Sequence, residues 1–288
     1  MIFNRSIVPA LGGGGARGFA HIGVLRIFER ESIGVKAIAG TSMGAIIGAL
    51  YAQHPDSFVV EQKIKTFLQS SMFKNSQDSL SAHKGPGSFL EQVANHLCEH
   101  VRNADKMRER IQLMDQQMQQ SLQEILEPMD IRDTTLPFAA VATDLITGKE
   151  VVMRKGPIIQ AVLASSAMPG ILSPVEMDGY RLTDGAATSS VPVRTAKRLA
   201  SRHKVVAVDV SSSLSHHPPL DNALSIILRT SAITGTCYKN ELLKQADIVI
   251  QPQVKLFSWA EFSNIEDFIA EGEQAAIKSL LKIKKALR

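Results

Sequence analysis

The sequence predicts an α/β fold, in which a mainly parallel sheet lies between two layers of helices. Short apolar runs alternate with longer segments of helical periodicity over most of the 288 residues. The connections between them are short, and several are rich in glycine. Alternating strands and helices joined in this way build parallel sheets that helices cover on both faces. We therefore expect a single three-layer α/β/α domain spanning residues 1–288.

Two strand–turn–helix units open the chain. Residues 7–11 are an apolar strand, and residues 18–31 carry apolar side chains at helical spacing. Residues 35–39 form a second apolar run that ends at Gly40, and residues 45–52 are small and apolar, as expected of a helix buried against a sheet. Both glycine turns thus fall between a strand and a helix.

From about residue 70 to residue 130 the composition shifts toward Gln, Ser, Met and charge, which predicts a helical insertion. One stripe of a long, otherwise polar helix is apolar. We consider two interpretations of it. The stripe packs on the body or against a second copy in a homo-oligomer, or it forms a flexible cap over a lipid pocket, for which methionine is suited. The stripe consists of Met107, Ile111, Met114, Met118, Leu122 and Ile125.

Strands and helices resume after Pro128. Residues 177–179, Met-Asp-Gly, predict the turn of a hairpin. The other predicted elements are strands at 137–145, 150–154, 204–213 and 247–252, helices at 157–168 and 220–246, and a basic helix that closes the chain.

The composition argues against several classes of protein. Cys98 and Cys237 belong to no pattern of metal ligands or paired disulfides, which favours a reducing, cytoplasmic compartment. No apolar run approaches about 18 residues, and the first residues lack a secretory leader, so we expect no membrane-spanning helix. A net charge of +4 without arginine-rich tracts argues against nucleic-acid binding. Peripheral contact with an anionic membrane, at its inner face, stays open.

Ser42 is the candidate nucleophile. It is the centre of GTSMG at residues 40–44, between a predicted strand and a predicted helix. A serine that protrudes from so sharp a turn needs neighbours without side chains that would collide, and Gly40 and Gly44 meet this need. The helix N-terminus also places positive potential beside Ser42, which favours an anionic intermediate. The pattern predicts a nucleophile elbow.

The glycine loop at residues 12–18 predicts a binding site for an oxyanion. Its consecutive backbone N–H groups, with no Cβ atoms to block access, suit the charged intermediate of acyl transfer. Gly13, Gly15 and Gly18 also satisfy the dinucleotide pattern G-x-G-x-x-G. That site requires an acidic residue at the end of the next strand, whereas residues 35–39 run directly into the GTSMG segment. We therefore favour the oxyanion loop.

Asp184 follows the predicted hairpin, and Asp-Gly alone indicates only a turn. With this segment, however, four motifs in order make the chain resemble the patatin-like phospholipase family, especially its small bacterial members. The motifs are GGGARG at 13–18, GTSMG at 40–44, ASSAMPGI at 164–171 and DGA at 184–186. The resemblance implies a serine acyl hydrolase that cleaves lipid esters, of the phospholipase A, lysophospholipase or esterase type.

The resemblance also implies roles for individual residues. Ser42 attacks the ester carbonyl, Asp184 is the general base of a dyad, and the reaction passes through an acyl-enzyme without metal or cofactor. The oxyanion hole is implied at the backbone of Gly13, Gly14 and Gly15. The supporting positions are Arg17, Gly18 and Gly185, and the segment 164–171 supports the site without a chemical step.

Two features bear on the base. The family usually has Asp-Gly-Gly, and Ala186 replaces the last glycine here, so the backbone would be strained if this position required positive φ. An aspartate also needs partial desolvation to raise its pKa, because its ordinary pKa near 3.9 makes it a weak base toward a hydroxyl.

Alternatives to the dyad stay open. His203, His216 and His217 follow Asp184 in the order of a Ser-Asp-His triad, although a loop of Ser, His and Pro is typical of solvated histidines. We interpret His21, on the apolar face of the first helix, as a hydrogen-bonded structural residue. Outside the enzymes, the alternative is an inactive protein of the same fold that binds partners through the Met-striped helix.

Overall fold

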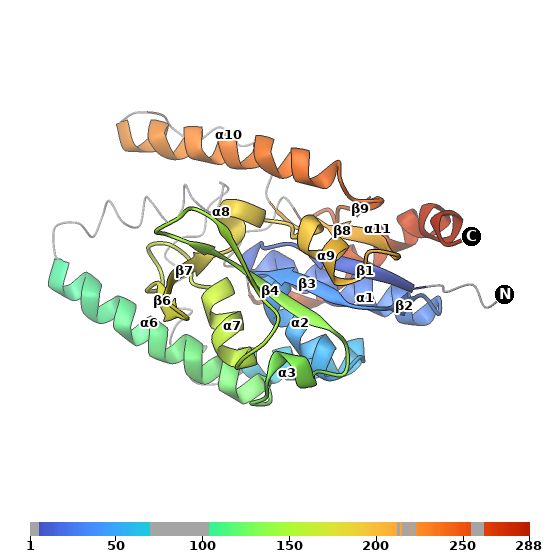
Figure 1. Ribbon diagram of the computed structural model, residues 1–288, viewed down its shortest axis with the longest axis horizontal. Helices are drawn as coiled ribbons and strands as arrows, with labels where there is room; N and C mark the ends of the chain where they lie inside the picture. Colours follow the sequence, from blue (N-terminus) through green and yellow to red (C-terminus); the bar gives the residue numbers. More distant parts are fainter. Residues whose placement is uncertain (1–5, 70–103, 212–213, 215–219, 221–222, 255–261) are drawn as a thin grey trace.

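The computed structural model describes residues 6–69, 104–211, 214, 220, 223–254 and 262–288. Helices lie on both faces of one central sheet, so the predicted three-layer architecture is confirmed (Figure 1). The strands described are β1 Ser6–Leu11, β2 Gly34–Val35, β3 Ile38–Thr41, β4 Phe138–Asp144, β5 Glu150–Met153, β6 Val175–Met177, β7 Tyr180–Asp184, β8 Lys204–Val208 and β9 Ile248–Ile250. The helices are η1 Gly15–Phe19, α1 Ala20–Arg30, α2 Met43–Gln53, α3 Ser57–Gln69, α6 Ala104–Ile125, η2 Ile131–Asp133, α7 Ile158–Ser165, α8 Ala186–Ser189, α9 Val193–Leu199, α10 Ala223–Leu243 and α11 Ile265–Ala286.

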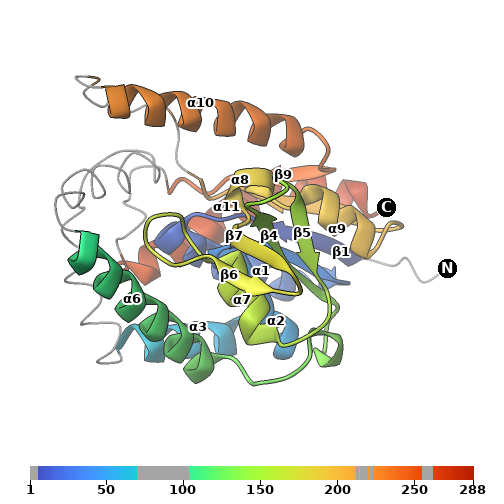
Figure 2. The ribbon, with the colours of Figure 1, turned by 60° about the vertical axis from the view of Figure 1, so that its left-hand side comes forward.

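The main path of the sheet runs in the order β6-β7-β4-β3-β1-β8-β9, with β2 beside β1 and β5 beside β4. Strands β4, β3, β1, β8 and β9 are parallel to one another. Strands β5 and β7 are antiparallel to β4, and the hairpin β6–β7 closes this end of the sheet (Figure 2). The sheet is therefore mainly parallel, as predicted, with an antiparallel end.

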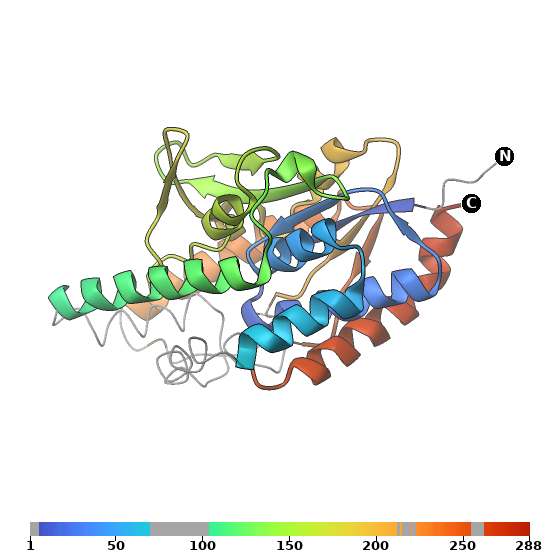
Figure 3. The same ribbon diagram turned by 90° about the horizontal axis from the view of Figure 1, so that it is seen from below.

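The sheet separates the core into two parts, and the side chains of β1 alternate between them. Ile7 and Leu11 join the larger core, which α1, α2, α7 and α11 cover. Val8 and Ala10 join the smaller one, which α9 and the end of α10 cover. Seen from below, α1, α2, α3 and α11 lie on the near side of the sheet (Figure 3), whereas α8, α9 and α10 lie on the opposite side (Figure 1).

Helix α1 packs closely on α11 because glycines lie at their crossing. A Cβ atom on Gly23 would lie 2.0 Å from the carbonyl oxygen of Ile269, and one on Gly272 would lie 2.0 Å from that of Ala20. Neither position leaves room for a side chain. The two helices together support η1 and the glycine loop that precedes it.

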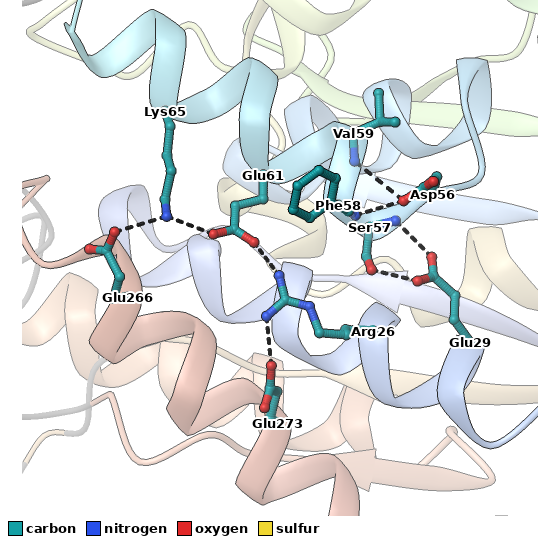
Figure 4. A network of polar contacts seen from close by, with 10 residues as sticks. All are labelled: Arg26, Glu29, Asp56, Ser57, Phe58, Val59, Glu61, Lys65, Glu266 and Glu273. Carbon is teal, nitrogen blue, oxygen red and sulfur yellow. Dashed lines mark hydrogen bonds and ion pairs between the residues drawn. The ribbon is translucent and has the colours of Figure 1, made fainter.

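An ion-pair network joins α3 to these helices (Figure 4). Arg26 of α1 pairs with Glu61 of α3 and, at 2.7 Å, with Glu273 of α11. Lys65 of α3 pairs with Glu61 at 2.7 Å and with Glu266 at 2.9 Å. Single surface ion pairs contribute little to stability. We assign the network an orienting role, because α3 carries side chains that line the pocket described below.

The register of three strands aligns residues that are distant in the sequence. Thr41 at the end of β3 pairs with Val141 of β4, and the next residue of β4, Ala142, pairs with Asp184 of β7. Strand β5 pairs with residues 140–143 of β4 and so occupies the other edge of β4, which means that β3 and β7 lie end to end along one edge. Thr41 and Asp184 stand at the two ends that meet, opposite neighbouring residues of β4, so Ser42 begins its turn beside Asp184.

The structure departs from the predicted elements at a few points. Helix α3 was not predicted, and η1 precedes α1 as a separate turn. Strand β8 ends at Val208, five residues before the predicted boundary, because Asp209 turns into a buried polar cluster. Helix α7 ends at Ser165, three residues early. Across the ranges given above, no helix has both the length and the apolar character to span a membrane.

Candidate active site

Ser42 lies on a strained turn between β3 and α2. Its φ of 55° and ψ of −127° are rare for a residue with a side chain, and such strain is typical of a nucleophile elbow. The flanking glycines permit the turn. A Cβ on Gly40 would lie 2.3 Å from the carbonyl oxygen of Gly44, and a Cβ on Gly44 would lie 2.2 Å from that of Leu11. The side chain of Ser42 is 7% exposed.

Ser165 at the end of α7 holds the backbone of the elbow. Its Oγ accepts a hydrogen bond of 3.1 Å from the Ser42 N–H and donates one of 2.6 Å to the carbonyl oxygen of Val141 on β4. All three groups are buried, so each hydrogen bond replaces contact with water that burial has removed. The segment 164–171, which was predicted to support the site, thus contacts the backbone of Ser42, the candidate nucleophile, directly.

Asp184 at the end of β7 faces Ser42. Its carboxylate accepts hydrogen bonds from the Ser42 hydroxyl and, at 2.8 Å, from the Ala186 N–H. Its own N–H donates to the carbonyl oxygen of Ala167 at 2.9 Å. Burial raises the pKa of Asp184 to about 6, because desolvation disfavours the charged form more than the two hydrogen bonds favour it. The desolvation that the dyad needs is therefore present.

The strain expected at Ala186 does not occur. Ala186 is the first residue of α8, is exposed, and is not among the described residues with positive φ. The glycine that the turn requires is Gly185, where a Cβ would lie 2.2 Å from the carbonyl oxygen of Val141. Alanine at position 186 therefore leaves the geometry of the carboxylate intact.

His21 and Ser190 fix the first peptide of the glycine loop. His21 Nε2–H donates to the Gly12 carbonyl oxygen at 2.8 Å, and the Gly13 N–H of the same peptide donates to the Ser190 carbonyl oxygen at 2.9 Å. Burial lowers the pKa of His21 to about 4, so the ring is neutral at physiological pH. His21 is the structural residue that the sequence indicated. The N–H of Gly13, predicted to face an oxyanion, is engaged elsewhere.

Arg17 fixes a later peptide of the loop. Its Nε donates to the Gly14 carbonyl oxygen at 3.2 Å, and its side chain is almost wholly buried. Burial lowers the pKa of Arg17 to about 10, which leaves it charged at neutral pH. Because a trans peptide points its N–H away from its carbonyl, this contact directs the Gly15 N–H to the other side. Gly15 lines the same pocket as Ser42.

The other glycines of the loop allow close approach to the elbow. A Cβ on Gly13 would lie 3.1 Å from the Ser42 Cβ, and a Cβ on Gly18 would lie 2.4 Å from the Met43 Cγ. In a dinucleotide site the third glycine serves close packing of a helix on its strand beside a bound pyrophosphate. Here the space at Gly18 holds the residue after the nucleophile, which favours the oxyanion interpretation.

A buried polar cluster supports the loop from behind. Asp209 accepts hydrogen bonds from the Ser211 hydroxyl at 2.6 Å and from Gln251 Nε2 at 3.0 Å, and Lys239 of α10 pairs with it at 3.1 Å. Burial alone would raise the pKa of Asp209, but Lys239 and these donors hold it below its ordinary value. A Cβ on Gly14 would lie 2.9 Å from the carbonyl oxygen of the next residue, Val210.

An apolar cavity of about 120 Å³ opens beside Ser42. Side chains from α2, α3, α6, η1 and the segment after α7 line it. Helix α6 contributes four residues of the predicted apolar stripe, which places a helix of the predicted insertion over the pocket. The stripe residue Met107 has a side chain outside the described set. The lining residues include Phe19, Met43, Ile46, Ile64, Phe67, Met114, Met118, Leu122, Ile125, Ser166, Met168, Ile171, Leu172 and Phe262.

Of the three histidines of the alternative triad, the structure describes His203 alone, and it places this residue far from Ser42. His203 precedes β8, whose far end at Val208 binds the Gly12 N–H. Because β8 and β1 are parallel, His203 lies at the opposite edge of the sheet from Ser42, about 16 Å along the strand. His216 and His217 lie outside the described residues.

Three contributors to the site were not identified from the sequence. Ser165, Ser166 and Asp209 carry no local pattern that sets them apart from ordinary buried polar residues. The signal available was the motif at 164–171, which places two adjacent serines at the end of an apolar helix. Adjacent residues at a helix end point in different directions, and this is how one serine contacts the elbow while the other lines the pocket.

Comparison with known proteins agrees with this geometry. A family model described as patatin-like phospholipase matches residues 10–197. A patatin-like phospholipase domain-containing protein of Caenorhabditis elegans is 32% identical over 216 residues, which cover 74% of this chain and 14% of that protein. An NTE family protein of Mycobacterium bovis is 32% identical over 188 residues, which cover 65% of this chain and 44% of that protein. The chain therefore spans less than half the length of these two relatives.

Among solved structures, VipD from Legionella pneumophila shares the fold. It aligns with a TM-score of 0.51 at 11% identity, over 97% of this chain and 66% of that one. The family model covers both Ser42 and Asp184, together with the glycine loop that approaches the elbow. On the match to the family model, this chain belongs to the patatin-like phospholipase family.

Proposed function

We propose that the protein is a serine acyl hydrolase that cleaves carboxylic esters of lipids through a dyad of Ser42 and Asp184. One observation carries the proposal. A strained, almost buried serine that lines an apolar cavity donates its hydroxyl hydrogen to a buried carboxylate. A carboxylate whose pKa is near 6 is ionised at neutral pH and is a better proton acceptor than an ordinary aspartate.

The chemistry follows from that hydrogen bond. Asp184 accepts the hydroxyl proton as Ser42 Oγ bonds to the ester carbonyl carbon, and the carbonyl oxygen becomes negatively charged. The proton then passes to the alkoxy oxygen as the C–O bond breaks, which releases the alcohol and leaves an acyl-serine. In the second half Asp184 takes a proton from water, the hydroxide attacks the acyl carbon, and the proton returns to Ser42.

The charged oxygen needs donors, and the glycine loop supplies them. Gly14 and Gly15 donate to no protein acceptor within the part of the chain that the structure describes, in contrast to Gly13. We assign their N–H groups to the oxyanion, together with the positive end of α2, which begins at Met43. Gly13 contributes by its missing side chain, which allows the loop to approach Ser42.

The cavity supports an acyl chain as the group bound beside Ser42. Its lining is almost entirely apolar, and it accepts no charged substrate group without a desolvation cost. Met114 and Met118 of α6 lie in the wall, where unbranched thioether side chains can adapt to chains of different shape. We therefore favour the cap over the partner-binding interpretation of the stripe. The homo-oligomer, the peripheral membrane contact and the cytoplasmic location stay predictions.

The test is covalent labelling by a fluorophosphonate, which reacts with activated serines. We expect labelling of the wild-type protein, none of Ser42→Ala, and loss of ester turnover in Asp184→Asn. His203→Ala serves as the control and should keep both activities, because it lies at the far edge of the sheet. A folded wild-type protein that neither labels nor hydrolyses any ester in a panel of chain lengths and headgroups would instead favour the inactive interaction protein.

A further inference from the structure

Ser166 follows the serine that holds the elbow and has no assigned role. It is the C-cap residue that follows α7, it is 3% exposed, and it lines the same cavity as Ser42. Its Oγ is buried and has no hydrogen-bond partner among the described residues. A buried hydroxyl in this state costs stability, since folding removes its water without replacing it.

The other serine hydroxyls of the cavity are engaged. Ser42 donates to Asp184, and Ser121 donates to the Gln117 carbonyl oxygen within α6 at 2.6 Å. Ser165, just outside the cavity, donates to Val141. Of the serines lining the wall, Ser166 is the one whose O–H remains available to a bound molecule.

The position of Ser166 limits what that molecule can present. Its neighbour Ser165 lies 3.1 Å from the Ser42 nitrogen, so Ser166 is one residue away from direct contact with the elbow. An acyl chain in the cavity carries no hydrogen-bond acceptor along its methylene groups. The acceptors at the scissile group are the two ester oxygens, and the reaction requires this group to lie at Ser42.

We propose that the Ser166 hydroxyl donates a hydrogen bond to an oxygen of the substrate ester. Ser166 would then be a catalytic residue in addition to the two members of the dyad. The inference rests on the proposed function. The bond is strongest as negative charge develops on the ester oxygens in the transition state, because a donor to a charged acceptor binds more tightly than one to a neutral acceptor. Ser166 therefore acts mainly on kcat.

Ser166→Ala tests this with a matched control in the same chain. Ser189 of α8 is also a fully buried serine whose Oγ has no partner among the described residues, but it does not line the cavity. We expect Ser166→Ala to lower kcat for a soluble p-nitrophenyl ester by roughly tenfold or more, with KM little changed. Ser189→Ala should keep the wild-type kcat. Neither variant should lower Tm, since each removes an unsatisfied hydroxyl.

Ser166→Thr keeps the hydroxyl and should recover most of the lost kcat. Wild-type kcat in Ser166→Ala overturns the inference, as does a loss that Ser166→Thr shares in full or that Ser189→Ala shows equally. These outcomes all require an active wild-type enzyme. A wild-type protein that hydrolyses no ester and resists the fluorophosphonate refutes the proposed function itself, and this inference falls with it.

Discussion

Asp184→Asn should stabilise the protein at neutral pH while abolishing turnover. Burial raises the pKa of Asp184 from 3.8 to about 6, a shift of about 2 units, and one unit corresponds to about 1.4 kcal/mol. In the unfolded chain the carboxyl ionises near pH 3.8, whereas in the folded protein it keeps its proton until about pH 6. Between these values the unfolded state binds fewer protons, so the free energy of unfolding falls as pH rises.

This fall in the free energy of unfolding is complete above pH 6 and amounts to about 3 kcal/mol. Asparagine cannot ionise in either state, so the free energy of unfolding of the variant does not include this fall. The advantage of the variant should therefore be roughly 0.5 kcal/mol at pH 4 and about 3 kcal/mol at pH 7.5, the latter equivalent to roughly 5–10 °C in Tm. Urea denaturation of both proteins at each pH measures it, because the other titrating groups cancel in the difference.

Asp144 provides a control whose pKa is shifted in the opposite direction. Thr147 donates to it through its hydroxyl, and the N–H groups of Thr147, Ile146 and Arg181 also donate, so its pKa is lowered. A lowered pKa contributes stability that is present above the ordinary value and is lost on acidification. Asp144→Asn should therefore be destabilising at pH 7.5 and less so in acid. An Asp184→Asn variant that shows the same pH trend as Asp144→Asn would refute the reasoning.

Three further predictions concern the base, the loop and the pocket. The kcat/KM for a soluble ester should rise with pH about a midpoint near 6, because only the ionised Asp184 accepts a proton; a flat profile from pH 5 to 8 would exclude it as the base. His21→Gln, whose amide can still donate to Gly12, should retain more turnover than His21→Leu, and equal losses would deny the hydrogen bond its role. Met118→Trp should fill the cavity and raise KM for long-chain esters severalfold while sparing short ones, as a panel of chain lengths would measure, and an unchanged preference would show that the acyl chain lies elsewhere.

Much of the fold and the central residues of the site could be predicted because they depend on local rules. The turn at Ser42 needs glycine on both sides, and the run at 12–18 needs to approach it closely; both requirements leave a mark in the sequence. The hairpin before Asp184 is equally local, with Asp178 and Gly179 at positive φ. The structure has each of these motifs at the position that the sequence predicted.

The rest depends on contacts between distant segments. The partner of the Gly13 N–H is Ser190, and the support for Ser42 comes from Ser165. Such pairs follow from strand register and helix placement, which no local pattern encodes. The direction of the methionine stripe on α6 was undetermined for the same reason, because an apolar stripe does not specify what it packs against. The backbone strain considered at Ala186 is absent because the start of α8 sets φ at that position.

Strand β4 aligns Thr41 and Asp184 through its adjacent residues Val141 and Ala142, and so sets the spacing between Ser42 and Asp184. A deletion of one residue within β4 would turn the following side chains of that strand to the opposite face of the sheet, since side chains alternate with a period of two, and would shift β7 relative to β3. Helix α6, which contributes Met114 and Met118 to the pocket wall, comes between β3 and β4 in the chain and belongs to neither strand. We expect changes of sequence on α6 to reshape the pocket without moving Ser42 or Asp184, so the preference for the bound group and the geometry of the proposed dyad are free to change independently.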